Sequence, residues 1–137
     1  MDLSATERVR LSVPAATPAV RIARAGAAGL ATRAGFTYHE VEQIQLAVGE
    51  AAALLADPQG DGRLTVTFDI TETSLVVVVD LTVPGASAPH GVTGGRAGVP
   101  AIAAAVLDAA TDEWRVERGG RQVVLRKDLA APDRDDD

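Results

Sequence analysis

Apolar and polar residues alternate along several short stretches of the chain, and this two-residue period predicts β-strands. In the clearest stretch, Leu64 to Ile70, polar Thr65, Thr67 and Asp69 separate the apolar positions. The same period occurs at 8–13 and 113–117. Residues 75–81 differ, because they form a nearly continuous aliphatic run. That run predicts a central strand covered on both faces.

Helical spacing of apolar residues occurs in three other stretches. The first is expected to begin with Thr17 as N-cap and Pro18 in the first turn, and to end near Ala34 before Gly35. The third has Pro100 in its first turn and runs to about residue 109. Residues 118–121 contain two glycines, so they predict a hairpin turn that leads into a last strand at 122–127.

The second helix has the most complete local signals. Thr37 and Glu40 stand in the relation of a capping box, and Phe36 and Val41 stand at the positions of a hydrophobic staple. One apolar stripe follows at helical spacing, made of Val41, Ile44, Val48, Ala51 and Leu55. Glu50 lies off this stripe, on a second and weakly apolar face. It is therefore the candidate catalytic carboxylate of the chain.

The predicted order is β-α-α-β-β-loop-α-β-β, without regular βαβ alternation. This order favours an α+β fold, a two-layer α/β sandwich with a mixed or mostly antiparallel sheet and helices on one face. The 137 residues suit one domain, placed at 1–129. Residues 83–98 have no periodicity and predict a long mobile loop. Residues 130–137 predict a disordered acidic tail.

Composition excludes several classes of function. The formal net charge is −6, which argues against direct binding of nucleic acid. The chain has no cysteine, so disulfides and thiolate metal sites are excluded. Its two histidines, His39 and His90, lack the spacing of metal ligands, and no metal site is predicted. With neither a secretion signal nor a membrane-spanning run, the expected location is the cytoplasm.

Two further sets of residues have open interpretations. Asp80 ends the aliphatic strand beside the long loop, where it is either a functional carboxylate or a polar strand terminus. Arg21 and Arg24 lie on the first helix. Exposed arginines are common, so a solvated face is favoured over a basic docking surface.

The order of elements resembles the ATP-binding fold shared by histidine kinases and gyrase (the Bergerat fold). Within that fold, the chain is similar to the anti-sigma factor serine/threonine kinases of bacterial partner-switching systems. The likeness is strongest at 33–51, which contains an aliphatic-Ala-Val-x-Glu-Ala run, and at 112–116 and 123–127. The resemblance implies ATP or ADP with Mg²⁺ as cofactor.

The motifs of that family match this chain only in part. Glu50 matches the acidic residue that orients or deprotonates a nucleophile, but Leu54 stands where the family has the Mg²⁺-binding Asn. Asp80 matches the aspartate that binds the adenine amino group, yet Thr82 and Pro84 replace two glycines after it. Gly98 is matched to a glycine that follows the lid. A leucine has no lone pair for a hard cation, so kinase activity is expected to be weak or absent. Divergent members of the family still bind nucleotide, so the resemblance leaves Glu50 and Asp80 open as a nucleotide site.

These matches and gaps imply a degenerate member of the family. It is expected to bind a sigma factor, an anti-anti-sigma (STAS) antagonist, or both, with Arg21 and Arg24 as contacts. The alternatives are an active serine kinase that phosphorylates the antagonist, with Glu50 as base, and a scaffolding protein without a sigma partner. The family often forms dimers, and Arg8 to Val13 offers a strand edge for pairing a second copy.

Overall fold

The computed structural model describes residues 7–56, 61–84 and 95–130. Within them the predicted order of strands and helices is confirmed. The elements are β1 (Glu7–Pro14), α1 (Pro18–Ala34), α2 (Tyr38–Leu55), β2 (Arg63–Ile70), β3 (Ser74–Thr82), η1 (Gly95–Gly98), α3 (Ala101–Ala110), β4 (Glu113–Glu117) and β5 (Gln122–Asp128).

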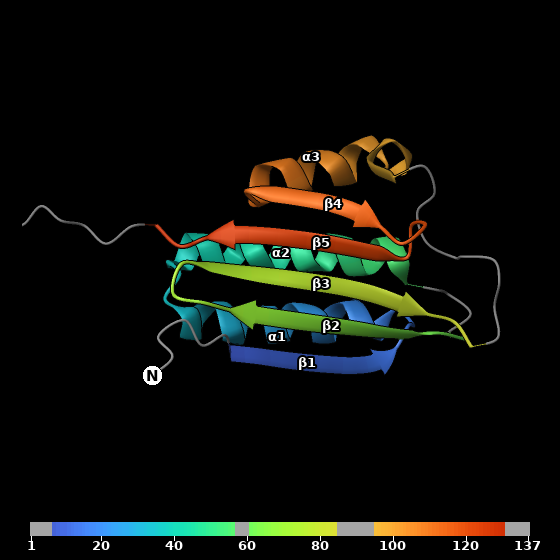
Figure 1. The fold of residues 1–137 in the computed structure, drawn as a ribbon, viewed down its shortest axis with the longest axis horizontal. Helices are drawn as coiled ribbons and strands as arrows, with labels where there is room; N and C mark the ends of the chain where they lie inside the picture. Colours follow the sequence, from blue (N-terminus) through green and yellow to red (C-terminus); the bar gives the residue numbers. More distant parts are fainter. Residues whose placement is uncertain (1–6, 57–60, 85–94, 131–137) are drawn as a thin grey trace, which may run out of the picture.

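The described strands form one sheet in the order β1-β2-β3-β5-β4 (Figure 1). Every strand pairing in it is antiparallel, so the sheet has no parallel part within the described residues. Helices α1 and α2 lie behind the sheet in Figure 1, while α3 lies beside edge strand β4. The fold is thus α+β, and it is consistent with the two-layer α/β sandwich expected from the sequence.

Small residues let α1 pack tightly in the helical layer. Its buried positions recur every four residues and are all alanines, namely Ala19, Ala23, Ala27 and Ala31. The predicted stripe of α2 is confirmed, because Ile44, Val48, Ala51 and Leu55 are buried and Val41 packs against the core. The core therefore lies between these two helices and one face of the sheet.

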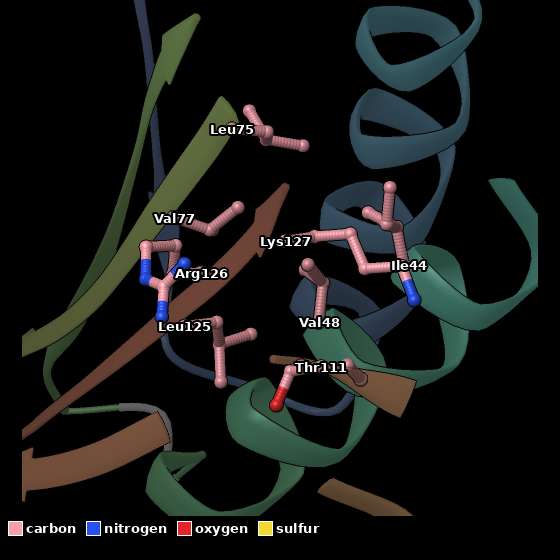
Figure 2. Close-up of a pocket in the computed structure, with 9 residues that line it drawn as sticks. Ile44, Val48, Leu75, Val77, Thr111, Leu125, Arg126 and Lys127 are labelled. Carbon is pink, nitrogen blue, oxygen red and sulfur yellow. The ribbon is translucent and has the colours of Figure 1, made fainter. Parts of the chain in front are cut away.

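Figure 2 shows how α2 meets the sheet. Ile44 and Val48 point from the helix toward Val77 and Leu125 of the sheet, around a cavity of about 10 Å³. At its rim the Lys127 Nζ donates a hydrogen bond to the Gln43 Oε1 at 3.0 Å. A space of this size is comparable with one water molecule, so the contact is close to solid packing.

The aliphatic run of β3 is covered on one face only, which corrects the prediction of two covered faces. Val77 and Val79 are buried against the helices, whereas Val76 and Val78 are half-buried on the opposite face. β3 is nevertheless the central strand, as predicted. We call this second side of the sheet, which carries Val76 and Val78, the open face.

The two predicted N-caps have different outcomes. Thr37 is confirmed: its hydroxyl accepts from the Glu40 N–H at 3.2 Å, and the Glu40 carboxylate accepts from the Thr37 N–H at 2.9 Å. Thr17 is the residue before α1, but its side chain makes no cap hydrogen bond. Its φ of −49° and ψ of −41° are already helical, whereas a side-chain cap requires an extended backbone.

The structure confirms the predicted turn between β4 and β5 and the end of α1, and it adds two features that the sequence did not predict. Gly119 and Gly120 have positive φ in the β4–β5 turn, as predicted, and Arg118 joins them with a φ of 58°. Gly35 ends α1 with a φ of 102°. In the segment predicted to be a loop, Gly95–Gly98 forms the short 3₁₀-helix η1. Residues 85–94 of that loop and 131–137 of the predicted tail lie outside the described residues.

The two caps give the first prediction. Thr37→Ala removes one half of the capping box and should lower the free energy of unfolding by about 1 kcal/mol. Thr17→Ala is the matched control, since it removes a hydroxyl that caps nothing, and it should change stability by only a few tenths of that amount. Urea unfolding followed by circular dichroism measures both variants. Equal losses in the two would contradict the assignment.

Candidate functional site

Glu50 lies in a hollow between the first two helices. The hollow has a volume of about 130 Å³ and is lined by Val20, Arg24, Leu46, Gly49, Glu50 and Ala53. Glu50 itself is half-buried. Nucleotide-sized ligands need pockets of about 300 Å³ or more, so this hollow alone is too small for one.

Arg24 enters the same hollow from α1 because position 49 is a glycine. A Cβ atom at Gly49 would lie 2.8 Å from the Arg24 Cδ, so the arginine stem rests directly on the helix backbone of α2. Two residues predicted for different roles, Glu50 and Arg24, are therefore brought together. Arg21 is exposed one helical turn earlier on α1.

The residue that follows Glu50 by one turn offers no metal ligand. Leu54 is partly buried and packs against the core. Among the described residues, no group of three or more His, Asp, Glu or Cys side chains could hold a metal ion. At the position of the matched Asn, Leu54 therefore supplies no oxygen ligand for Mg²⁺.

Asp80 lies on the open face, on the side of the sheet away from Glu50. Its neighbours Val79 and Leu81 point into the core, and the strand period turns Asp80 outward. Its carboxylate accepts weak hydrogen bonds from Arg118 at 3.5 Å and Gln122 at 3.4 Å. The sheet therefore lies between Asp80 and Glu50.

Gly98 ends η1 and is exposed, three residues before α3 begins. The nearby Arg96 is held by two contacts. Its guanidinium carbon lies 4.0 Å from the centre of the Trp114 ring, and its Nη2 donates to Asp108 at 2.9 Å. Asp108 also accepts from the Trp114 indole at 2.7 Å. This cluster of Arg96, Asp108 and Trp114 fixes η1 against α3 and β4.

Sequence reasoning missed a groove between α2 and α3. It has a volume of about 410 Å³ and is lined by Gln43, Leu46, Ile102, Ala105, Val106, Ala109 and Ala110. Leu46 also lines the Glu50 hollow, so the two depressions adjoin. Gln43 alone among the lining side chains is polar, and its Oε1 already accepts from Lys127. The groove therefore suits apolar side chains better than a charged nucleotide. One residue in the sequence could have indicated this groove. Ile102 is a large apolar residue on a helix that has no polar stripe to mark a solvent-facing side.

Comparison with known proteins identifies relatives. No family model matches the chain. The serine-protein kinase RsbW of Halalkalibacterium halodurans is 31% identical over 81 residues, which are 58% of this chain and 50% of the relative. The protein of that name from Listeria innocua is 34% identical over 77 residues, or 53% of this chain and 49% of the relative.

The chain is thus related in sequence to the RsbW serine-protein kinases, which confirms the resemblance found in its motifs. It spans about half the length of the curated relatives it matches. No helix of the described residues has both the length and the apolar character to cross a membrane.

Gly49 gives the second prediction. In Gly49→Ala the new methyl group displaces the Arg24 stem, a flexible chain that moves at low cost. The reactivity of Arg24 toward phenylglyoxal should therefore rise, while stability changes by about 1 kcal/mol or less. Gly29→Ala on α1 is the control, because nothing lies within 4 Å of its added Cβ. Equal reactivity of Arg24 in the unchanged protein, Gly49→Ala and Gly29→Ala would contradict the contact between Arg24 and Gly49.

Proposed function

We propose that the chain is an anti-sigma-type regulator that acts by binding protein partners and has a degraded ATP site. The partners are a sigma factor, an anti-anti-sigma (STAS) antagonist, or both. Kinship with the RsbW serine-protein kinases supports the family. The position of Asp80 on the open face is the observation that supports a degraded ATP site.

Phosphoryl transfer requires a nucleotide held by its base, its phosphates and Mg²⁺ at the same time. In this chain Asp80, the expected adenine contact, hydrogen-bonds to Arg118 and Gln122 on the open face. Glu50 lies in the helical layer, and Leu54 offers no oxygen for Mg²⁺. Asp80 therefore does not converge with Glu50, and no Mg²⁺ ligand stands at Leu54, which supports a loss of nucleotide chemistry.

The helical layer has the surface character of a protein-binding site. The large apolar side chains exposed in the described residues all belong to helices: Ile22 at 45%, Tyr38 at 79%, Leu46 at 47% and Ile102 at 81%. Leu46 and Ile102 share the α2–α3 groove, and Leu46 also lines the hollow that holds Arg24. Apolar anchors beside an arginine are typical of interface centres.

A second candidate function is an active serine kinase of the antagonist. Glu50 favours it, since the carboxylate of the matched motif is retained and is half-buried in a hollow. The matched residues make up only about half of each relative. Kinase activity is therefore a proposal for this chain.

Calorimetry with Mg-ATP separates the two functions. A regulator with a degraded site should release no binding heat, and Asp80→Asn should behave as the unchanged protein. Transfer of γ-³²P to a co-purified STAS protein should also be undetectable. Micromolar binding that disappears in Asp80→Asn would overturn the degraded site, because it would require Asp80 to contact the base. Transfer of γ-³²P to the STAS protein would then establish the kinase.

Partner binding gives a separate prediction. Leu46→Asp should reduce capture of the sigma factors and STAS proteins encoded in the source genome by about tenfold or more, because it places an unpaired charge in the interface. Glu72→Lys, in the exposed β2–β3 turn, is the control and should bind normally. If neither class of protein binds the unchanged chain, the scaffolding alternative is left.

A further inference from the structure

Another pocket lies between the end of α1 and the start of α2, and we call it the Tyr38 pocket. Its volume is about 380 Å³, which is within the usual range of ligand sites, roughly 300–1,000 Å³. The residues that line it include Thr32, Phe36, Tyr38, Val41, Glu42 and Gln45. None of its lining residues also lines the Glu50 hollow or the α2–α3 groove, so it is separate from both.

Aromatic side chains are concentrated at the Tyr38 pocket. The whole chain has two Phe, one Tyr and one Trp, and two of these four residues, Phe36 and Tyr38, line this pocket. Phe36 is 7% exposed and belongs to the core, whereas Tyr38 is 79% exposed at the rim. The face of an exposed aromatic ring attracts cations, because the π-electrons give it a partial negative charge.

The polar groups of the Tyr38 pocket are mainly hydrogen-bond acceptors. The Thr32 Oγ1 donates its proton to the Ala28 carbonyl oxygen at 2.8 Å, so only its lone pairs are left for a ligand. The Glu42 carboxylate accepts hydrogen bonds and donates none, and the Gln45 side chain adds an amide oxygen. A ligand that matches this set of groups must therefore be rich in donors.

The charge of the Tyr38 pocket is negative and is not balanced locally. Glu42 is the one charged residue among those that line the pocket, and it takes part in none of the salt bridges within residues 7–56, 61–84 and 95–130. Arg33, which follows Thr32 on α1, pairs with Glu7 instead. The formal net charge of −6 acts in the same direction, so the pocket favours a cationic ligand.

We propose that the Tyr38 pocket binds an arginine side chain presented by a protein partner. A guanidinium group has five N–H donors and no acceptor, which matches the acceptors of Thr32, Glu42 and Gln45. Its flat group stacks on an aromatic ring such as that of Tyr38, and its apolar stem suits Val41. The inference goes beyond the proposed function, because it names the chemical group that is recognised and does not depend on which protein carries it.

The exposure of the lining residues favours an arginine within a protein over a free small cation. Sites for free small molecules bury about 70–90% of the ligand surface. Here Thr32, Tyr38 and Glu42 are all exposed, so the pocket covers a guanidinium group from one side only. The surface of a protein partner then supplies the remaining cover, as it does around the arginine anchors of protein interfaces.

Titration of the full chain with the peptide acetyl-Ala-Arg-Ala-amide, followed by ¹⁵N NMR at low salt, tests the proposal. The peptide should bind at millimolar concentration and shift the amide signals of residues 36–45. The peptide with Lys in place of Arg has the same charge and should bind about threefold more weakly, because an ammonium group neither stacks nor forms paired hydrogen bonds. Methylguanidinium, the free cation, should also bind more weakly than the arginine peptide.

Variants of the pocket separate recognition from general attraction to an acidic protein. Glu42→Gln and Tyr38→Leu should each weaken the arginine peptide about three- to tenfold. Both residues are exposed, so circular dichroism and melting temperature should stay unchanged. Glu72→Gln, in the β2–β3 turn, removes the same charge elsewhere and should bind normally. Equal affinity of the Glu42→Gln and Glu72→Gln proteins, equal binding of the two peptides, or no shifts at residues 36–45 overturns the proposal. Tighter binding of methylguanidinium overturns the protein source in favour of a free cation.

Discussion

The two-residue period of β3 determines where the chemistry of this chain lies. Once Val77, Val79 and Leu81 face the helices, Asp80 must face the other way, because neighbouring side chains of a strand point to opposite sides. A shift of one residue would turn Val76, Val78 and Asp80 together to the helical side and turn Val77, Val79 and Leu81 outward. The packing of the core thus keeps Asp80 away from the helical layer, which holds Glu50.

The helical layer combines tight internal packing with an incompletely covered outer surface. Alanines at every fourth position bring α1 close to its neighbours, and Gly49 lets the stem of Arg24 lie on α2. Toward solvent, α3 has no polar stripe and exposes Ile102. The exposed apolar side chains of these helices are the part of the layer on which the proposed partner binding depends.

Local signals in the sequence predicted local structure well. The element order and the capping box at Thr37 are confirmed, because they depend on residues that are neighbours in the chain. Thr17 shows the limit, since the same residue type fails as a cap when its own backbone is helical. The sequence could not predict the face of the sheet on which Asp80 lies. The residues before it are aliphatic at both odd and even positions, so their pattern does not distinguish the two faces. The α2–α3 groove and the contacts of Trp114 join distant segments, which no local pattern encodes.

Trp114 is the single tryptophan of the chain, and its ring lies beneath the Arg96 guanidinium while its indole N–H donates to Asp108. Indole emission responds to a nearby cation and to the state of the ring N–H. The protein therefore contains its own fluorophore at the junction of η1, α3 and β4. A partner or ligand that moves η1 away from α3 changes the wavelength and intensity of the Trp114 emission. Binding at this junction can therefore be followed by intrinsic fluorescence without a label.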